Sequence, residues 1–224
     1  MANRHKSHRY QSSSALNRKR LGSPVFSSSP RLALTCIAHS LQFLLDDMLS
    51  SGRGGHANIV CTQPRRIAAV GVAERVAEER GEPIGRSVGY VIRGESKRSA
   101  ASRLLFCTTG VLLKMLEDDH NLATVTHVVI DEVHERSCDS DLLLLMCRQM
   151  LARHKTKTGT VPQLKVVLMS ATLDSAVFVK YFESSGLKVG VVKIEGVSVA
   201  YECRFDHQLC IHDTSLQLAI SIIL

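Results

Sequence analysis

From about residue 40, short apolar runs alternate with longer segments in which apolar residues recur at helical spacing. The runs are rich in Val, Ile and Leu, which favours buried strands, at NIVCTQ (58–63), VGYVIRG (88–94), LLFCTT (104–109), HVVIDE (127–132) and KVVLMSAT (165–172). Helical patterns follow them, at RRIAAVGVAERVAEERG (65–81), GVLLKMLEDD (110–119), SDLLLLMCRQMLARH (140–154) and LDSAVFVKYF (173–182). Near-continuous apolar strands separated by helices predict an α/β fold, a parallel sheet with helices on both faces.

Polar residues close four of the predicted strands. In a parallel sheet the carboxyl ends of the strands share one edge, and ligands bind in the crevice outside that edge. The residues expected there are Thr62-Gln63, Thr108-Thr109, Asp131-Glu132 and Ser170 to Thr172. Their convergence predicts a site at this edge.

Asp131 and Glu132 form an acidic pair directly after the strand-like run HVVI. In nucleotide hydrolases an acid at this point binds Mg²⁺, and a neighbouring carboxylate can orient the attacking water. Asp131 suits the first role and Glu132 the second. The alternative for an isolated acidic pair is to solvate the loop after the strand.

The first 31 residues are basic, Ser-rich and free of acidic side chains. Seven Lys and Arg precede the first acid, Asp46, so much of the formal net charge of +7 belongs to this leader. A positive net charge favours polyanionic partners such as nucleic acid. For the leader itself three interpretations stay open: a disordered tail, an organellar transit peptide, or a basic import or nucleic-acid-binding patch around NRKR (17–20).

The composition of the 224 residues allows one sizeable domain with an aliphatic core, because 45% of them are hydrophobic but only 4% are aromatic. We expect a disordered leader over residues 1–40, the α/β domain over 41–200 and a divergent, truncated tail over 201–224. The tail ends on LQLAISIIL, an apolar stretch that would need to be covered.

Seven scattered cysteines without a Cys-x-x-Cys pair favour a reducing, intracellular location, cytoplasmic or nuclear, with organellar import as the alternative. In the tail, Cys203, His207, Cys210 and His212 fit no zinc signature. No apolar run approaches the roughly 20 residues of a membrane-spanning helix. The sequence therefore predicts a soluble protein without a membrane partner.

Four short motifs occur in a fixed order: TQPRR (62–66), TTG (108–110), DEVHER (131–136) and SAT (170–172). In sequence and spacing they resemble the DEAH/DExH-box RNA helicases of superfamily 2, and the likeness covers roughly Gln42 to Phe182. The resemblance implies the first of two RecA-like domains, a three-layer α/β/α sandwich. It also implies an enzyme that couples ATP hydrolysis, with Mg²⁺, to RNA unwinding.

The resemblance assigns chemical roles to individual residues. Asp131 and Glu132 would hold Mg²⁺ and activate water, and His134 would link the nucleotide state to domain closure. Arg75 would stack on the nucleotide base, a contact that suits a planar guanidinium. The motif that couples hydrolysis to strand separation is Ser170, Ala171 and Thr172.

The resemblance also implies contacts to the RNA backbone, which position a strand without reading its sequence. The residues in question are Pro64, Arg65, Arg66, Arg93, Thr108, Thr109 and Gly110. Gly94 departs from the large apolar residue that the family has beside Arg93, which weakens the transfer at that position.

Each of these roles has a structural alternative. Arg65 and Arg66 could cap a helix or remain solvated. Ser170 and Thr172 could bond nearby backbone groups. Arg75 could pair with an acid one turn along its helix, Glu78 or Glu79.

The phosphate-binding loop G-x-x-x-x-G-K-[ST] is missing ahead of QFLLDDM (42–48). No glycine lies between Gly22 and Gly52, and SGRGGH (51–56) follows the helix and lacks the lysine. We therefore expect poor or no ATP hydrolysis, because this loop supplies most of the positive contacts to a triphosphate. RLALTCI (31–37) is apolar enough to replace the strand before the loop; otherwise the sheet is incomplete, with two unpaired strand edges.

The sequence thus predicts a partial DEAH/DExH-box helicase that contacts RNA through its backbone and hydrolyses ATP weakly or not at all. The alternatives are a non-catalytic RNA-binding or partner-docking module and a non-functional gene fragment. The sequence identifies neither the RNA target nor any protein cofactor.

Overall fold

The computed structural model describes residues 30–155, 164–170, 175–195, 199–205, 208–214 and 217–223. Its helices are α1 (Pro30–Ser50), α2 (Arg66–Glu79), α3 (Thr109–Asp118), α4 (Cys138–Lys155) and α5 (Ala176–Glu183), with single 3₁₀ turns at η1 (Gly54–His56) and η2 (Val133–Glu135). Its strands are β1 (Ile59–Gln63), β2 (Val88–Ile92), β3 (Glu95–Lys97), β4 (Leu104–Thr108), β5 (His127–Ile130), β6 (Lys165–Ser170), β7 (Val189–Glu195), β8 (Val199–Phe205), β9 (Gln208–Thr214) and β10 (Gln217–Ile223).

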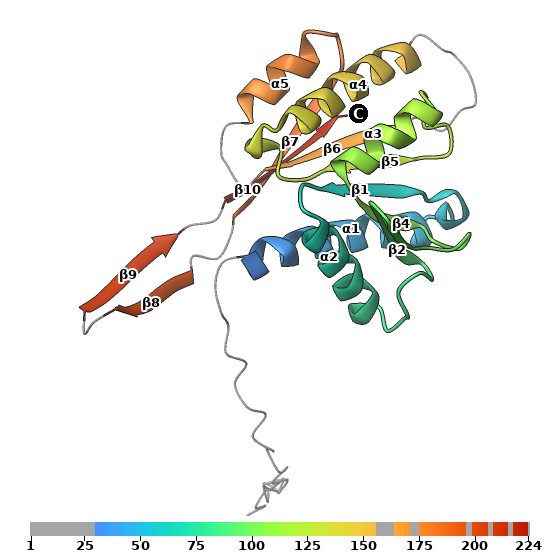
Figure 1. The fold of residues 1–224 in the computed structure, drawn as a ribbon. Helices are drawn as coiled ribbons and strands as arrows, with labels where there is room; N and C mark the ends of the chain where they lie inside the picture. The colour runs from blue at the N-terminus through green and yellow to red at the C-terminus, as the bar shows by residue number, and fades with distance from the viewer. Residues whose placement is uncertain are drawn as a thin grey trace, which may run out of the picture.

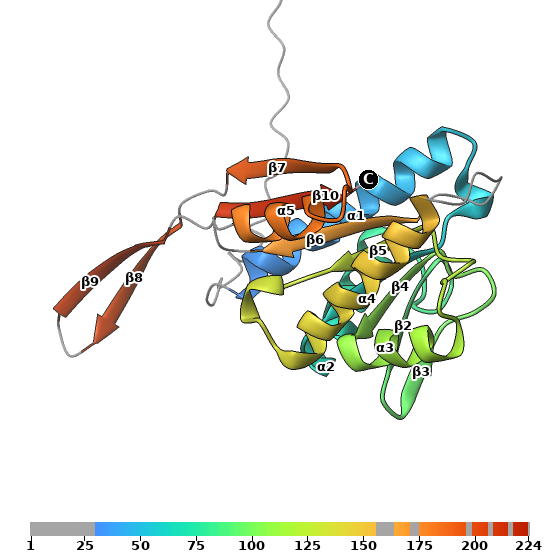
Figure 2. The ribbon, with the colours of Figure 1, turned by 90° about the horizontal axis from the view of Figure 1, so that it is seen from above.

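Eight strands form one sheet in the order β3-β2-β4-β1-β5-β6-β10-β7. The five central strands from β2 to β6 run parallel, whereas β3 and β10 are antiparallel to their neighbours. β8 and β9 make a separate two-stranded hairpin that stands away from the body of the domain (Figures 1 and 2).

Two apolar layers lie on opposite faces of this sheet. Ile59 and Cys61 of β1 face the layer that includes α1 and α2, whereas Val60 between them faces the layer of α3, α4 and α5. This alternation follows from the period of two in a strand. Because both faces are covered (Figure 1), β1 is buried along its whole length. The expected three-layer α/β/α fold is confirmed.

The five predicted strands and four predicted helices all form, each within a few residues of its expected bounds. The interpretation of RLALTCI (31–37) as a strand is wrong, because this stretch begins α1. Pro30 suits the first turn of a helix, where no N–H partner is needed. The apolar face continues through Leu41 and Leu45, which are 2% and 1% exposed. Helical spacing over 21 residues thus outweighs the local apolar run.

The strand position left open by the sequence is occupied by β10. It pairs antiparallel with β6, where Ile222 lies opposite Val167, and antiparallel with β7, where Ile222 lies opposite Gly190. β6 and β7 are therefore parallel to each other and one strand apart. The expected pair of unpaired edges is absent from the described part of the sheet.

The domain boundary expected near residue 40 falls inside α1, and the one expected at 200 falls inside β8.

Three described cysteines behave as small buried hydrophobes. Cys61, Cys107 and Cys147 are each 0% exposed, and burial raises the pKa of their thiols, to about 12 for Cys107 and Cys147. Thiols held in this protonated state are poor nucleophiles.

Within the described residues, no helix has the length and apolar character needed to cross a membrane.

His127, at the start of β5, makes folding pH-dependent. Burial, with help from the Lys165 and Arg53 cations, lowers the pKa of its imidazole to about 4. The folded protein keeps His127 neutral, whereas the unfolded chain protonates it below its ordinary pKa of about 6.5. The stability that this difference contributes is complete above pH 6.5 and is lost as the pH falls towards 4.

We therefore expect the wild type to lose about 2 kcal/mol of unfolding free energy relative to His127→Gln between pH 7 and pH 4.5. Urea unfolding at the two pH values measures this difference. His56→Gln is the matched control, because it replaces an exposed histidine and keeps the buried His127, so the pH dependence of the wild type should remain. A His127→Gln profile parallel to that of the wild type would contradict the assignment.

Candidate functional site

The strand ends with polar residues share one edge of the sheet. Gln63 at the end of β1 lies opposite Thr108 at the end of β4, and Thr62 lies opposite Ile130 of β5. Asp131 follows Ile130 directly, and its backbone N–H bonds the carbonyl of Thr62 at 3.2 Å. The parallel register therefore sets these ends at one level and forms the carboxyl edge that the sequence predicted.

Asp131 is held in place by a buried hydrogen bond. The Gln63 amide Nε2 donates to Asp131 Oδ2 over 2.8 Å, and the two residues are only 2% and 5% exposed. Burial and the neighbouring Glu132 charge raise the pKa of Asp131 to about 7, and the Gln63 bond opposes this rise. The carboxylate has little access to solvent, so a cation or a proton is needed to offset its charge.

Glu132 begins a tight turn beside Asp131. It adopts a left-handed backbone with φ of +52°, and Arg136 on the other side of η2 does the same with φ of +50°. This conformation is costly for residues other than glycine and occurs often at functional sites. Within the turn, Glu132 Oε2 lies 3.3 Å from His134 Nδ1. Burial raises the pKa of Glu132, and the proximity of His134 opposes that rise.

This pair of carboxylates fits a Mg²⁺ ion. Mg²⁺ prefers hard oxygen ligands, and in proteins it is held by one or two carboxylates while it keeps several waters. Asp131 and Glu132 supply that set, and the Gln63 amide donates to Asp131 without introducing a competing positive charge. Within the described residues, this site included, no group of three or more His, Cys, Asp and Glu side chains is placed to hold a metal ion, so the two carboxylates would bind Mg²⁺ together with water or phosphate oxygens.

The segment after Gln63 leads directly into an arginine-bearing turn. Arg65 occupies the N-cap position of α2 but makes no capping bond through its side chain; instead Nη2 lies 3.4 Å from Glu135 Oε1. Arg66 donates from Nη2 to the carbonyl of Arg93 over 3.0 Å. The capping alternative therefore does not apply to Arg65. Arg65 therefore lies beside the acidic turn, and the backbone of Arg93 lies beside Arg66.

Gly94 has a local explanation. Ile92 and Glu95 face each other across the β2–β3 hairpin, so Arg93 and Gly94 form a two-residue turn. Gly94 has φ of +84°, a conformation that glycine adopts without strain. The departure from a large apolar residue at this position thus follows from the tight turn, which leaves Arg93 exposed.

The TTG segment marks the transition from β4 to α3. Thr108 occupies the N-cap position with an extended backbone and no capping bond from its side chain, while Thr109 is buried and Gly110 is exposed. A Cβ at Gly110 would meet no atom within 4 Å, so packing does not require glycine there. The first N–H groups of a helix have no partner inside the helix and suit anions such as phosphate.

The stretch of sequence that carries these motifs matches the model of a known family. Residues 35–179 match the sequence model of the DEAD/DEAH box helicases. The chain belongs to this family. The match confirms the resemblance on which the assignments of Asp131 and its neighbours rest.

Curated relatives carry helicase names. The chain is 53% identical over 144 residues to the DExH-box ATP-dependent RNA helicase DExH1 of Arabidopsis thaliana, covering 64% of this chain and 14% of that protein. It is 55% identical over 141 residues to the putative ATP-dependent RNA helicase DHX57 of Mus musculus, with 63% and 10% covered. It is 48% identical over 145 residues to the ATP-dependent DNA/RNA helicase DHX36 of Bos taurus, with 63% and 14% covered. The chain spans only 10–14% of the length of these three relatives.

Arg75 stands apart from the carboxyl edge, and two of the three residues of the SAT motif lie outside the described residues. Arg75 lies nine residues along α2 from Arg66, about 13 Å at the helical rise. Its Nε contacts Glu79 Oε1 at 2.8 Å, the pairing that the sequence offered as an alternative to stacking on a base. Ser170 ends β6 and is buried, whereas Ala171 and Thr172 lie outside the described residues.

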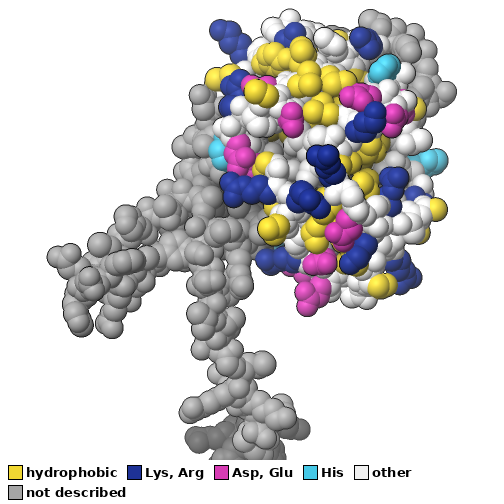
Figure 3. Space-filling view, in the orientation of Figure 1, with side chains coloured by type: hydrophobic (Ala, Val, Ile, Leu, Met, Phe, Trp, Pro, Cys, Tyr) yellow, Lys and Arg dark blue, Asp and Glu magenta, His cyan; other side chains and the backbone are white. Residues whose placement is uncertain are grey.

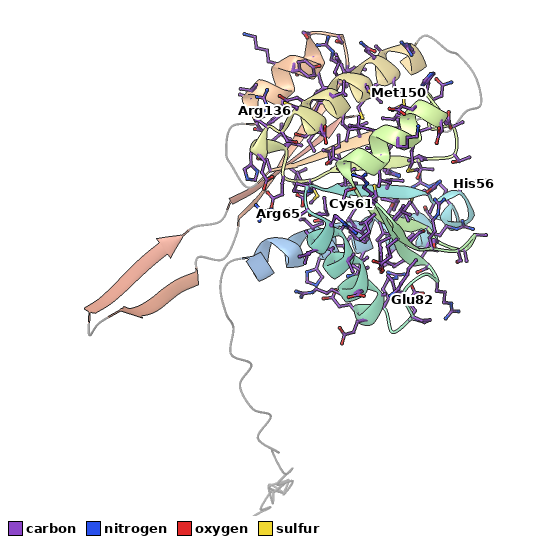
Figure 4. All side chains as sticks on the ribbon, viewed as in Figure 1. His56, Cys61, Arg65, Glu82, Arg136 and Met150 are labelled. Carbon is purple, nitrogen blue, oxygen red and sulfur yellow. The ribbon has the colours of Figure 1, made fainter. Side chains whose placement is uncertain are left out.

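The glycine-rich loop SGRGGH (51–56) lies at the wrong end of the sheet to hold phosphate beside Asp131. It follows α1 and precedes the start of β1, whereas Gln63 is the last residue of that strand and bonds Asp131 at its other end. Figure 4 shows His56 of this loop and Arg65 at opposite ends of the domain. The helicase family's phosphate loop therefore has no substitute among the described residues.

Gln63 is the site residue whose role the sequence did not reveal. The sequence places Gln63 at the carboxyl edge of the sheet. The family resemblance, however, implies a role only for its neighbours Pro64, Arg65 and Arg66. A side chain that bonds a carboxylate 68 positions away leaves no trace in local spacing. The signal available in advance was a polar amide ending an otherwise apolar strand, where burial demands a partner.

Proposed function

We propose that this chain supplies the first RecA-like part of a DExH-type RNA helicase, binds the RNA backbone at its carboxyl edge and hydrolyses ATP weakly or not at all. The observation that carries the proposal is the shared edge of Gln63, Thr108 and Asp131 beside the Arg65–Arg66 turn. The family match and the helicase names of its relatives support it.

RNA contact rests on local geometry, not on overall charge. Seven of the 28 Lys and Arg precede Asp46, which leaves 21 to balance all 21 acidic residues. On the face drawn in Figure 3, basic side chains are interspersed with acidic ones. The exposed guanidinium groups at the carboxyl edge, with the start of α3, are the groups suited to phosphate.

Weak hydrolysis follows from the missing phosphate loop. Charge stabilisation does most of the work in phosphoryl transfer. Asp131 and Glu132 would hold Mg²⁺, which supplies charge neutralisation between phosphates when bound. Without the loop lysine and its backbone N–H groups, the γ-phosphate lacks its main positive contacts. A non-catalytic RNA-binding module is therefore the second candidate function.

RNA affinity measured by fluorescence anisotropy tests the binding surface. We expect Arg65→Ala with Arg66→Ala to weaken binding of a single-stranded RNA by about tenfold or more. The slope of log affinity against log salt should fall by about 1.4 if both arginines contact phosphates. Arg98→Ala is the control, because Arg98 is exposed beyond β3, away from this edge. Equal losses in the control and the double variant would contradict the proposal.

Hydrolysis is tested on the same protein. With Mg²⁺, ATP and saturating RNA we expect phosphate release close to background. RNA-stimulated turnover that Asp131→Asn abolishes would overturn the claim of weak hydrolysis. RNA binding without any effect of nucleotide would favour the non-catalytic module.

A further inference from the structure

One buried hydrogen bond joins two parts of the site that the proposed function treats separately. Gln63 is the last residue of β1, and its amide bonds Asp131 at 2.8 Å. The next residue, Pro64, opens the segment proposed to contact RNA. Gln63 is thus covalently continuous with the RNA segment and hydrogen-bonded to the metal-binding carboxylate.

Strand pairing holds the backbone at Gln63 from both sides. Its backbone is paired with Thr108 of β4, and the preceding Thr62 is paired with Ile130 of β5. Gln63 as a whole is only 2% exposed, so water competes little for the bond. A hydrogen bond in such surroundings is strong, and a buried partner left without it incurs a penalty.

We propose that Gln63 is a positioning residue that couples RNA contact at Pro64–Arg66 to cation binding at Asp131. This inference rests on the proposed function and adds a coupling route within it. When RNA binds and displaces residues 64–66, the position of the Gln63 amide changes, and the orientation of the Asp131 carboxylate changes with it. A cation on Asp131 acts on the turn through the same bond.

Cation binding and RNA binding can also be coupled by charge alone. Arg65 lies 3.4 Å from Glu135, and its charge also acts on Glu132. A cation bound at the carboxylates would attract RNA phosphate through space without any help from Gln63. The two routes differ in one respect: coupling through charge survives the loss of the Gln63 amide, whereas coupling through the hydrogen bond does not.

Linkage allows the coupling to be measured without hydrolysis. If a cation changes RNA affinity by some factor, RNA changes cation affinity by the same factor. Mn²⁺ serves as the probe for the Mg²⁺ site, followed by electron paramagnetic resonance, and a labelled single-stranded RNA reports its own affinity by anisotropy. We expect saturating Mn²⁺ to change the RNA Kd of the wild type by about fivefold, with RNA changing the Mn²⁺ Kd equally.

Gln63→Met is the decisive variant, because methionine has a similar length and fills buried space without an amide. We expect each ligand still to bind this variant, but the mutual effect to fall below about 1.5-fold, well under the usual range for coupled sites. Gln63→Leu repeats the test with different packing. The matched control is Gln42→Met, which removes another amide-to-carboxylate bond, from Gln42 to Glu79 at 2.7 Å, and should keep the full coupling.

The outcomes separate the two proposals. If RNA or Mn²⁺ does not bind the wild type, the proposed function fails and the coupling fails with it. If both bind without affecting each other, only the coupling is overturned. Coupling that persists in both Gln63 variants assigns it to charge and overturns the role of Gln63.

Discussion

Deleting residues 216–224 is expected to destroy the cooperative unfolding of the domain or lower its Tm by about 10–20 °C. The deletion removes β10, which pairs with β6 on one side and β7 on the other. Each backbone hydrogen bond of such a ladder contributes about 0.5–1.5 kcal/mol, against a total stability of about 5–15 kcal/mol for a typical domain. Because β10 lies inside the sheet, its deletion removes two hydrogen-bond ladders at once, and the expected effect is large. Thermal unfolding followed by circular dichroism measures it.

A matched variant separates β10 from the hairpin before it. Gln217 lies opposite Glu195, so β7 and β10 are antiparallel neighbours whose ends meet. Replacing residues 196–216 by an Asn-Gly turn would join them as a tight hairpin without β8 and β9. This variant should unfold close to the wild-type Tm. If the 216–224 deletion also melts like the wild type, β10 does not hold the sheet together.

Asp131→Asn is expected to stabilise the metal-free protein increasingly as the pH rises from 4 to 8. The folded protein raises the pKa of Asp131 to about 7, mainly through burial. Its ordinary value is about 3.9, so between the two values the folded state keeps a proton that the unfolded state has released. The contribution of Asp131 to the stability of the wild type is therefore greatest below pH 4 and is lost as the pH rises to 7. The asparagine does not titrate and avoids this loss, which we expect to be about 3 kcal/mol.

Urea unfolding in EDTA at pH 4.5 and pH 8 measures the difference between the two proteins. Asp139→Asn, which removes an exposed carboxylate in the first turn of α4, should shift stability by no more than about 0.5–1 kcal/mol. Excess Mg²⁺ at pH 8 should narrow the gap by stabilising the wild type alone. A gap that stays constant with pH would show that the buried carboxylate is not the source.

The sequence predicted the elements whose signal is local. The run IVCTQ (59–63) is buried on both faces, and its consecutive apolar residues already indicate a buried strand. The same holds for the shared edge, because parallel strands bring their ends together whatever joins them. Four motifs in order then identified the family, which the match over residues 35–179 confirms.

The sequence could not predict features that depend on distant pairing. β10 follows β6 by more than 40 residues, and no local pattern shows that it would run antiparallel between two parallel strands. RLALTCI (31–37) reads as a strand in isolation and becomes helical only as part of a longer amphipathic run. The bond from Gln63 to Asp131 likewise needs the sheet register before it can be seen. In each case tertiary context decides between local alternatives.

The late position of β10 has a consequence for biosynthesis. β6 and β7 are synthesised before β10, so the nascent chain cannot close this side of its sheet until residues 196–216 and then β10 itself have been added. For that interval both strands present bare amide edges to other chains in the cell, a state prone to mispairing and aggregation. Expression yield should therefore depend on chaperone capacity more than the stability of the finished domain would suggest.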